Sequence, residues 1–217
     1  VIEFSETVCA GPLLSKELDS ISRIYTDSKI PIIAIVGGSK ISTKLEVIKS
    51  LSNFVDYLIL GGGIANTILK AQGKEIGKSL YEESMLGTAK KMIERNSECQ
   101  IMEIFDVVVA KEINESSKSD IKDINSVSND DLILDIGPKT SNSYEEIIKK
   151  SSTIIWNGPL GLFEIDQFSS GTERIAQAIA QCDGYSIAGG GDTVSAIEKF
   201  GVTDGISYIS TGGGAFL

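Results

Sequence analysis

The chain has 217 residues, is 41% hydrophobic and 6% aromatic, and carries a net charge of −10 at pH 7. This acidity argues against binding to duplex nucleic acid or to an anionic membrane surface, because both attract basic proteins. The sequence has no histidine, which excludes a Ser-His-Asp triad and His-ligated metal sites within it; any divalent ion would then bind oxygen ligands, as Mg²⁺ prefers.

The predicted elements begin with a helix at 13–25, where apolar residues recur at helical spacing. Apolar runs then alternate with helical patterns, which is typical of right-handed β–α–β crossovers. The elements expected next are strands at 32–36, 57–60, 99–103 and 106–110, and helices at 41–54, 64–71 and about 81–95.

Polar residues dominate between Lys111 and Asp131, which predicts a solvated excursion or a small hairpin. The remaining strands are expected at 132–135, 153–156, 185–188 and 207–210, and the remaining helices around 144–148, 172–182 and 193–200. Thr140 or Ser141 is expected to cap the first of these helices. The whole pattern predicts an α/β fold with a doubly wound, mostly parallel sheet in a Rossmann-like three-layer sandwich, and a single domain over residues 32–217.

Four predicted strands are followed by clusters of glycine, at 37–38, 61–63, 189–191 and 212–214. Glycine lets a loop bring its backbone N–H groups close to a ligand, and parallel sheets bind ligands at the carboxyl ends of their strands. We therefore expect these turns to converge on one site that favours anions.

Two motifs come close to known nucleotide-binding fingerprints. GGGIAN at 61–66 follows a strand and opens a helix, but Asn66 stands where a dinucleotide fingerprint has its third glycine, and only Glu103 is a candidate for the ribose-binding acid. GKEIGKS at 73–79 has one residue too few for a P-loop and lies between two helices. An NAD-dependent oxidoreductase domain and a non-catalytic nucleotide- or protein-binding module stay as alternatives.

Polar side chains follow the glycine clusters. Lys40 and Lys44 are expected to share a face of the first helical turns, beside the positive end of that helix, although such lysines are often only solvated. Asp192 follows the cluster at 189–191 and suits either a helix N-cap or a ligand of Mg²⁺. Asn157 is suited to contact phosphate and Glu164 to accept hydrogen bonds from sugar hydroxyls.

Together these segments resemble phosphoglycerate kinase, and its bacterial form most closely. The resemblance is carried by GGSKISTK at 37–44, GGGIANT at 61–67, LDIGP at 134–138, WNGPLGLFE at 156–164, GGGDT at 189–193 and STGGGAF at 210–216. It follows the order of the family and matches the carboxyl-terminal, nucleotide-binding half of a two-domain enzyme. Residues 1–31 would then be the interdomain segment and helix, and residues 32–217 the nucleotide-binding domain.

The resemblance implies reversible phosphoryl transfer from 1,3-bisphosphoglycerate to ADP in glycolysis, with Mg²⁺ and ADP or ATP bound by this half. Adenine would lie among Gly38, Gly62, Leu80, Leu134 and Leu162. Glu164 would hold the ribose, and Asp192 would bind Mg²⁺. The phosphates would be held by Lys44, Asn157 and the backbone of Gly190, Gly191, Asp192 and Thr193, and the nucleotide would also contact Gly158 and Pro159. The transferred phosphoryl group would be stabilised by Lys40, Lys44 and the N–H groups of Gly212, Gly213 and Gly214.

The family also has an amino-terminal, phosphoglycerate-binding half and a tail beyond the position of Leu217, and neither is recognisable here. We therefore expect a fragment that binds MgADP or MgATP without turnover and whose partner is that amino-terminal domain. Three widely spaced cysteines, Cys9, Cys99 and Cys182, are expected to be buried reduced thiols, as is usual in a cytoplasmic protein.

Overall fold

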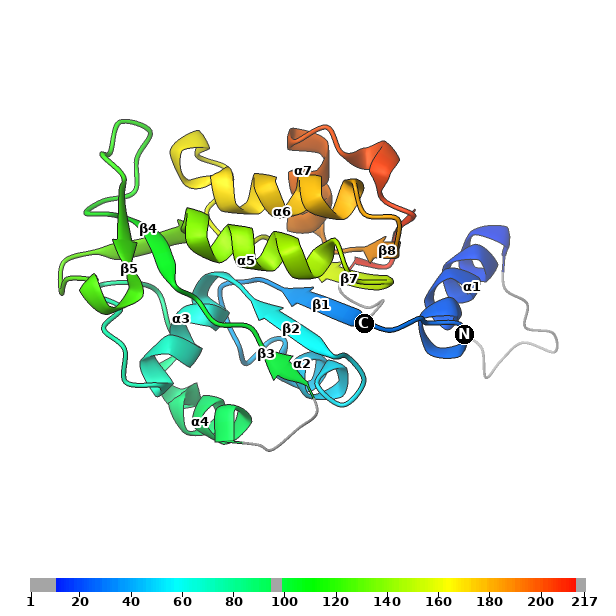
Figure 1. Cartoon of the computed structure of the whole chain (residues 1–217), viewed down its shortest axis with the longest axis horizontal. Helices are drawn as coiled ribbons and strands as arrows, with labels where there is room; N and C mark the ends of the chain where they lie inside the picture. Colours follow the sequence, from blue (N-terminus) through cyan, green and yellow to red (C-terminus); the bar gives the residue numbers. More distant parts are fainter. Residues whose placement is uncertain (1–10, 95–98, 214–217) are drawn as a thin grey trace, which may run out of the picture.

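The structure is a computed structural model that describes residues 11–94 and 99–213 (Figure 1). Its centre is a 6-stranded sheet in the order β3-β2-β1-β7-β8-β9, and every neighbouring pair runs parallel. These strands are β1 (Ile32–Val36), β2 (Tyr57–Leu60), β3 (Gln100–Ile101), β7 (Thr153–Asn157), β8 (Tyr185–Ala188) and β9 (Tyr208–Ile209).

Helices cover both faces of this sheet (Figure 1). One face carries α2 (Leu45–Leu51), α3 (Gly62–Ala71) and α4 (Leu86–Glu94), and the other carries α5 (Pro138–Ile148), α6 (Ser170–Ala180) and α7 (Gly191–Lys199). Strand β1 is buried on both sides, since Ala34 and Val36 pack toward the first group of helices while Ile33 and Ile35 pack toward the second. The doubly wound, Rossmann-like three-layer fold expected from the sequence is confirmed.

A second, 3-stranded antiparallel sheet lies beside the first, in the order β5-β4-β6. It consists of β4 (Asp106–Ala110), β5 (Asp120–Asp123) and β6 (Leu132–Ile136), with a short 3-10 helix, η3 (Ile124–Ser126), after β5. The sequence placed residues 106–110 and 132–135 among the alternating strands of a mostly parallel sheet, and this part of the prediction is wrong. The polar segment before β6 folds back as a hairpin, so β4 gains antiparallel partners.

A buried carboxylate holds that hairpin in place. Asp131 accepts hydrogen bonds from Lys111 Nζ at 2.7 Å, from Lys122 Nζ at 2.7 Å and from the backbone N–H of Ser128 at 2.7 Å. Burial opposes ionisation of Asp131, but these donors outweigh it and lower its pKa to about 2. Of the two alternatives expected for this segment, the small hairpin is the one observed, and it contains its own ionic core.

Two predicted helices begin later than expected. The helix expected at 41–54 starts at Leu45, because Ser42 donates its backbone N–H to Glu82 Oε2 at 2.8 Å and Thr43 donates its hydroxyl to the carbonyl of Lys40 at 2.8 Å, which stabilises a turn instead. The helix expected from residue 81 is a 3-10 turn, η2 (Glu83–Met85), that leads into α4.

The expected cap of α5 is also wrong. Gly137 occupies the N-cap position, and the carboxylate of Asp106 on β4 accepts the backbone N–H groups of Lys139 at 3.0 Å and Thr140 at 2.8 Å. A carboxylate from a different strand thus replaces the local hydroxyl cap, and it fixes α5 against the second sheet. The other 3-10 turns are η4 (Asp166–Phe168) and η5 (Thr203–Gly205).

Helix α1 (Pro12–Thr26) lies at one end of the molecule, outside the layers (Figure 1). Its apolar residues divide between two surfaces: Ile24 is buried, whereas Leu13, Leu14 and Leu18 are exposed. Among the described residues no helix has the length and apolarity needed to cross a membrane. Cys99 is buried and Cys182 half-buried, neither forms a disulfide within the described ranges, and Cys9 lies outside them.

Candidate functional site

The glycine-rich turns meet at the carboxyl edge of the parallel sheet. The backbone N–H of Gly37 donates to the carbonyl of Asn157 at 2.9 Å, and that of Gly62 donates to the carbonyl of Leu160 at 3.0 Å. A Cβ on Gly37 would lie 1.8 Å from the carbonyl oxygen of Pro159. The turns after β1, β2 and β7 therefore touch backbone to backbone, and glycine is needed there for that contact.

A cavity of about 580 Å³ opens at this edge, between the two sheets. Many of the residues matched to a nucleotide by resemblance line it, namely Gly38, Gly62, Leu80, Leu134, Pro159, Leu162, Glu164 and Asp192. We call the part formed by Gly38, Gly62, Leu80, Leu134 and Leu162 the apolar end. The volume of the whole cavity is in the range of known small-molecule sites.

Backbone contacts fix the apolar end although its side chains are partly open. Leu80 is 58% exposed, yet its carbonyl accepts a hydrogen bond from Asn66 Nδ2 at 3.1 Å. The backbone N–H of Leu162 donates to the carbonyl of Leu134 at 2.7 Å and so ties the turn after β7 to β6. An exposed leucine on a fixed backbone is suited to cover a planar apolar ligand.

Beside the cavity lies a group of polar residues that we call the polar end: Lys44, Asn157, Gly158 and residues 190–193. Lys44 Nζ donates to the carbonyl of Gly37 at 2.6 Å, to the carbonyl of Asn157 at 3.1 Å and to Asn157 Oδ1 at 2.5 Å. Burial lowers the pKa of Lys44, and the carboxylate of Asp192 acts in the opposite direction. The lysine is thus a half-buried cation within the electrostatic reach of one carboxylate.

Hydrogen bonds connect this lysine to the start of α7. Asn157 Nδ2 donates to the carbonyl of Gly189 at 2.7 Å, and Thr193 Oγ1 donates to the same carbonyl at 2.8 Å while it accepts the N–H of Gly158 at 2.7 Å. Helix α7 has Gly190 at its N-cap, with a φ of 101°, and no side chain caps its first turn. Asp192 is therefore not an N-cap; it lies exposed in the first turn and lines the cavity.

The remaining predicted site residues, Lys40 and the glycines at 212–213, do not line the cavity. Lys40 is exposed in the turn before α2, its side chain makes no hydrogen bond or ion pair within the described ranges, and it does not line the cavity. Lys40 and Lys44 do not share a helical face, because Lys44 is only the N-cap of α2. The N–H of Gly212 already donates to Ser210 Oγ at 3.1 Å, Gly213 has a φ of 62°, and Gly214 lies outside the described residues.

The family model of phosphoglycerate kinase matches residues 1–217. The chain belongs to the phosphoglycerate kinase family. It is similar to the solved phosphoglycerate kinase from Coxiella burnetii, with 48% identity and a TM-score of 0.90, over 96% of this chain and 54% of that chain. It is also similar to the phosphoglycerate kinase from Pyrococcus horikoshii OT3, with 30% identity and a TM-score of 0.80, over 95% of this chain and 53% of that one. The chain thus spans about half the length of these phosphoglycerate kinases.

Sequence reasoning missed Asp135, which lines the same cavity of this phosphoglycerate kinase domain. The residue is 2% exposed, its Oδ2 accepts the N–H of Gly171 at 2.6 Å, and its Oδ1 has no hydrogen-bond partner among the described residues. Burial raises the pKa of Asp135 to about 8. The sequence did contain a signal for this residue, since Asp135 is an acid at the end of an apolar strand and inside the LDIGP motif.

The segment that resembles a P-loop has a structural role. Gly77 forms an isolated antiparallel bridge with Leu132, and the N–H of Lys78 donates to the carbonyl of Asp131 at 2.7 Å. The segment therefore extends the edge of the second sheet and does not wrap a phosphate, as the wrong spacing indicated. Lys78 nevertheless lines the cavity, a position that the motif alone did not suggest.

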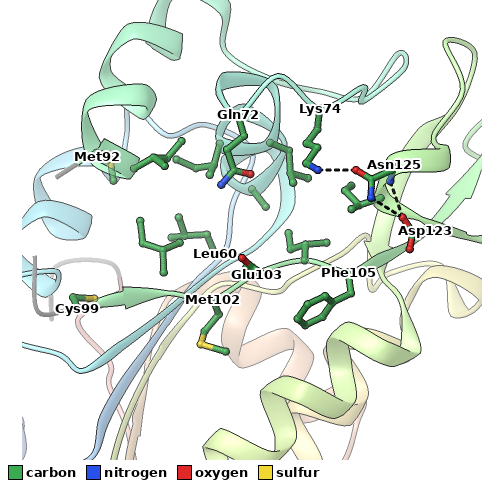
Figure 2. A pocket seen from close by; sticks show the side chains of 17 residues that line it. Leu60, Gln72, Lys74, Met92, Cys99, Met102, Glu103, Phe105, Asp123 and Asn125 are labelled. Atoms are coloured by element: carbon green, nitrogen blue, oxygen red, sulfur yellow. Dashed lines mark hydrogen bonds between the residues drawn. The ribbon is translucent and has the colours of Figure 1, made fainter. Parts of the chain in front are cut away.

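The dinucleotide alternative loses its two supports. A Cβ on Gly61 would lie 2.5 Å from Leu160 Cδ2, and one on Gly63 would lie 2.2 Å from the carbonyl oxygen of Ser39, so this glycine loop is packed against neighbouring loops. Glu103, the candidate ribose-binding acid, lines a different cavity (Figure 2). The geometry disfavours an NAD-dependent oxidoreductase.

Proposed function

We propose that this chain is the nucleotide-binding half of a phosphoglycerate kinase, which binds MgADP and MgATP during reversible phosphoryl transfer from 1,3-bisphosphoglycerate to ADP. The observation that carries the proposal is that residues from five separate turns converge on one cavity. One end of this cavity is apolar, and the cationic Lys44 lies beside its other end. Family membership supports the reaction, and the convergence supports the location of the nucleotide.

The apolar end is suited to the base. Leu80, Leu134 and Leu162 offer faces of the size and polarity that an adenine ring requires, and Gly38 and Gly62 leave the cavity open beside them. Glu164 is exposed at the rim, where its carboxylate would accept hydrogen bonds from both ribose hydroxyls. This arrangement would direct the phosphates toward the polar end.

The polar end offers a lysine and a helix N-terminus to the phosphates. An ammonium group has three donor hydrogens, and Lys44 already has three acceptors, so a phosphate oxygen would have to displace one of them. Asn157 Oδ1 is the acceptor most easily replaced, because a side chain can rotate. The first N–H groups of α7 lack a side-chain cap and would donate hydrogen bonds to a second phosphate oxygen.

The acidic residues fit a nucleotide-bound Mg²⁺ better than a free metal centre. Among the described residues no three or more Asp, Glu or Cys side chains come together, and Asp192 is the carboxylate beside Lys44. Mg²⁺ commonly binds through one or two carboxylates and substrate phosphates. When bound, the ion would neutralise charge on the phosphate oxygens.

Phosphoryl transfer needs placed cations and N–H donors more than a general base, because charge spreads over three oxygens in a loose transition state. Lys40, Lys44 and the glycines at 212–214 would supply them. We further propose that this half alone binds nucleotide without turnover, since its relatives are about twice as long. Leu13, Leu14 and Leu18 on α1 are an exposed apolar surface that the amino-terminal, phosphoglycerate-binding domain would cover. A cytoplasmic location stays a prediction.

Calorimetric titration of the 217-residue chain with MgADP tests the proposal. The wild type and the control Lys91→Ala, an exposed lysine on α4, should bind alike. Lys44→Ala should bind about tenfold more weakly, a loss of about 1.4 kcal/mol. Absence of MgADP binding by a folded wild-type chain would contradict the nucleotide site. Turnover in a coupled assay would contradict only the claim that this half is inactive alone.

A further inference from the structure

A second cavity, of about 530 Å³, lies between α3, α4, β3 and η3 (Figure 2). Its walls combine polar groups with apolar side chains, among them Leu60, Ile68, Met92, Ile101 and Ile124. None of the residues assigned above to the base, ribose, phosphates or Mg²⁺ lines it. Its volume falls within the range of small-molecule sites, roughly 300–1,000 Å³.

The polar groups of this cavity are not equally satisfied. Lys74 Nζ donates to Asn125 Oδ1 at 2.6 Å, and Asn125 Nδ2 donates to Asp123 Oδ1 at 3.0 Å, so that these three residues satisfy one another at one end (Figure 2). Glu103 and Gln72 make no side-chain hydrogen bond or ion pair within the part of the chain that the structure describes, and Figure 2 shows them on opposite walls. The free polar groups are thus one carboxylate and one amide.

We propose that this cavity is a second small-molecule site, for compounds with an apolar body and a cationic or hydrogen-bond-donating end. The apolar walls would bury the body of the ligand. The carboxylate of Glu103 would attract the cationic end, because the charge of Lys74 lies within the electrostatic reach of Asp123 and the negative charge of Glu103 remains. An anionic compound of the same shape would meet that charge without compensation.

The second site shares a wall with the first. Ala65 and Leu69, one turn apart on α3, line both cavities, and so does Ile104. Ile104 packs against three separate hydrophobic clusters, and α3 begins at Gly62 of the apolar end. Since protein interiors are closely packed, a ligand that moves Ile104 or α3 on one side changes the space on the other. Occupancy of the second cavity therefore alters nucleotide affinity; this coupling, unlike the site itself, rests on the proposed function.

The probe that tests the site is 2-naphthylmethylamine, and its matched anionic control is 2-naphthoate. In methyl-labelled protein, the amine should shift the NMR signals of Met92 and Ile101, which line only the second cavity, before those of Leu134 and Leu162, which line only the first. The naphthoate should bind more weakly than the amine. The reverse order of shifts, or equal binding of both compounds, would overturn the proposal.

Two variants locate the amine. Glu103→Gln should lower the affinity for the amine about threefold, the usual effect of an exposed ion pair. The control Glu146→Gln on α5 should leave this affinity unchanged. Met92→Trp should fill the cavity and abolish binding of the amine. Thermal unfolding and the methyl spectrum check that each variant is folded. Unchanged binding of the amine by folded Met92→Trp would refute the site.

The coupling is measured separately. With the amine near saturation, the dissociation constant of MgADP should change by about fivefold, at the lower end of known couplings between sites, and MgADP should change the affinity of the amine by the same factor. Unchanged nucleotide affinity would overturn the coupling but leave the second site. Failure of MgADP to bind at all would count against the nucleotide site, while the amine and its controls would still decide the second cavity.

Discussion

At the apolar end of the proposed nucleotide site, side chains from both sheets surround an open cavity, whereas at the polar end the groups already bond to one another. Leu80 and Leu162 have their backbones fixed and their side chains facing space. Lys44, by contrast, donates to three protein oxygens. The apolar end is ready for a ligand, and the polar end must exchange hydrogen bonds to receive one.

This difference follows from the cost of leaving each kind of surface unpaired. An open apolar wall costs only its contact with water, but a buried ammonium without acceptors would lose its charge or destabilise the fold. Asn157 and the carbonyl of Gly37 therefore hold Lys44 ready in the absence of phosphate. We expect the apolar end to set affinity for the base, and the polar end to respond to phosphate and Mg²⁺.

The largest expected effect is on turnover and concerns Lys40, which lacks the bonds that hold Lys44. In the full-length enzyme, Lys40→Ala should lower kcat about 100-fold or more, as expected when a donor acts only in the transition state. Its MgADP affinity should change less than twofold. Steady-state kinetics and calorimetry check this, with Lys91→Ala as the control. Equal losses of affinity and turnover would assign Lys40 to ground-state binding, like Lys44.

The next effect concerns the stability of the fold and its dependence on Asp135, which lines the same cavity. Asp135 has a folded-state pKa of about 8 against an ordinary value of 3.8, because it is buried. Above about pH 4 the unfolded chain loses this proton while the folded chain keeps it, so rising pH destabilises the fold until about pH 8. In the wild type, the free energy of unfolding measured with urea should therefore fall by roughly 1 kcal/mol per pH unit between pH 5 and 7. In Asp135→Asn, which cannot titrate, this dependence on pH should be absent.

The comparison for Asp135 is the slope, not the absolute stability, since the amide can leave a buried donor unpaired. Asp131 does not interfere, because its pKa is lowered to about 2 and its contribution is lost only below about pH 4. A wild type and Asp135→Asn with the same slope would mean that the carboxyl is ionised in the folded chain.

Local patterns were enough to predict the strand ends of this site. The apolar runs before 37–38, 61–63 and 189–191 end where β1, β2 and β8 end, since a buried strand and a glycine turn are both encoded by adjacent residues. The role of the glycines was harder to predict. Gly37 and Gly63 are required by the carbonyls of other loops, which no neighbouring residue reveals.

Several failures of prediction involve distant contacts. The turn at Lys40 depends on Glu82, and the cap of α5 depends on Asp106, each more than 30 residues away. Strand β4 joins the second sheet because β5 and β6 return to it, although residues 107–110 are as apolar as those of β1. The role of each site residue is likewise beyond the sequence, and those assignments stay predictions.

A smaller effect is expected at Asp192, and it sharpens the difference between the two ends. Asp192→Ala should weaken MgADP about tenfold, or about 1.4 kcal/mol, while ADP without Mg²⁺ binds as before or slightly better. Removal of the carboxylate should also lower the pKa of Lys44 further, because Asp192 raises that pKa. Calorimetry with and without Mg²⁺ measures both. Equal weakening under the two conditions would reject a metal ligand.

The smallest expected effect, and the most selective, is at Leu80. Its side chain is 58% exposed and would be covered by the base, so Leu80→Ala should cost about 1 kcal/mol, or about fivefold in ADP affinity. Inorganic tripolyphosphate has no base and should bind the variant and the wild type equally. Lys44→Ala should weaken both ligands. If Leu80→Ala also weakened tripolyphosphate, the two ends would not be separable, because the leucine would then support the phosphate groups through the fold.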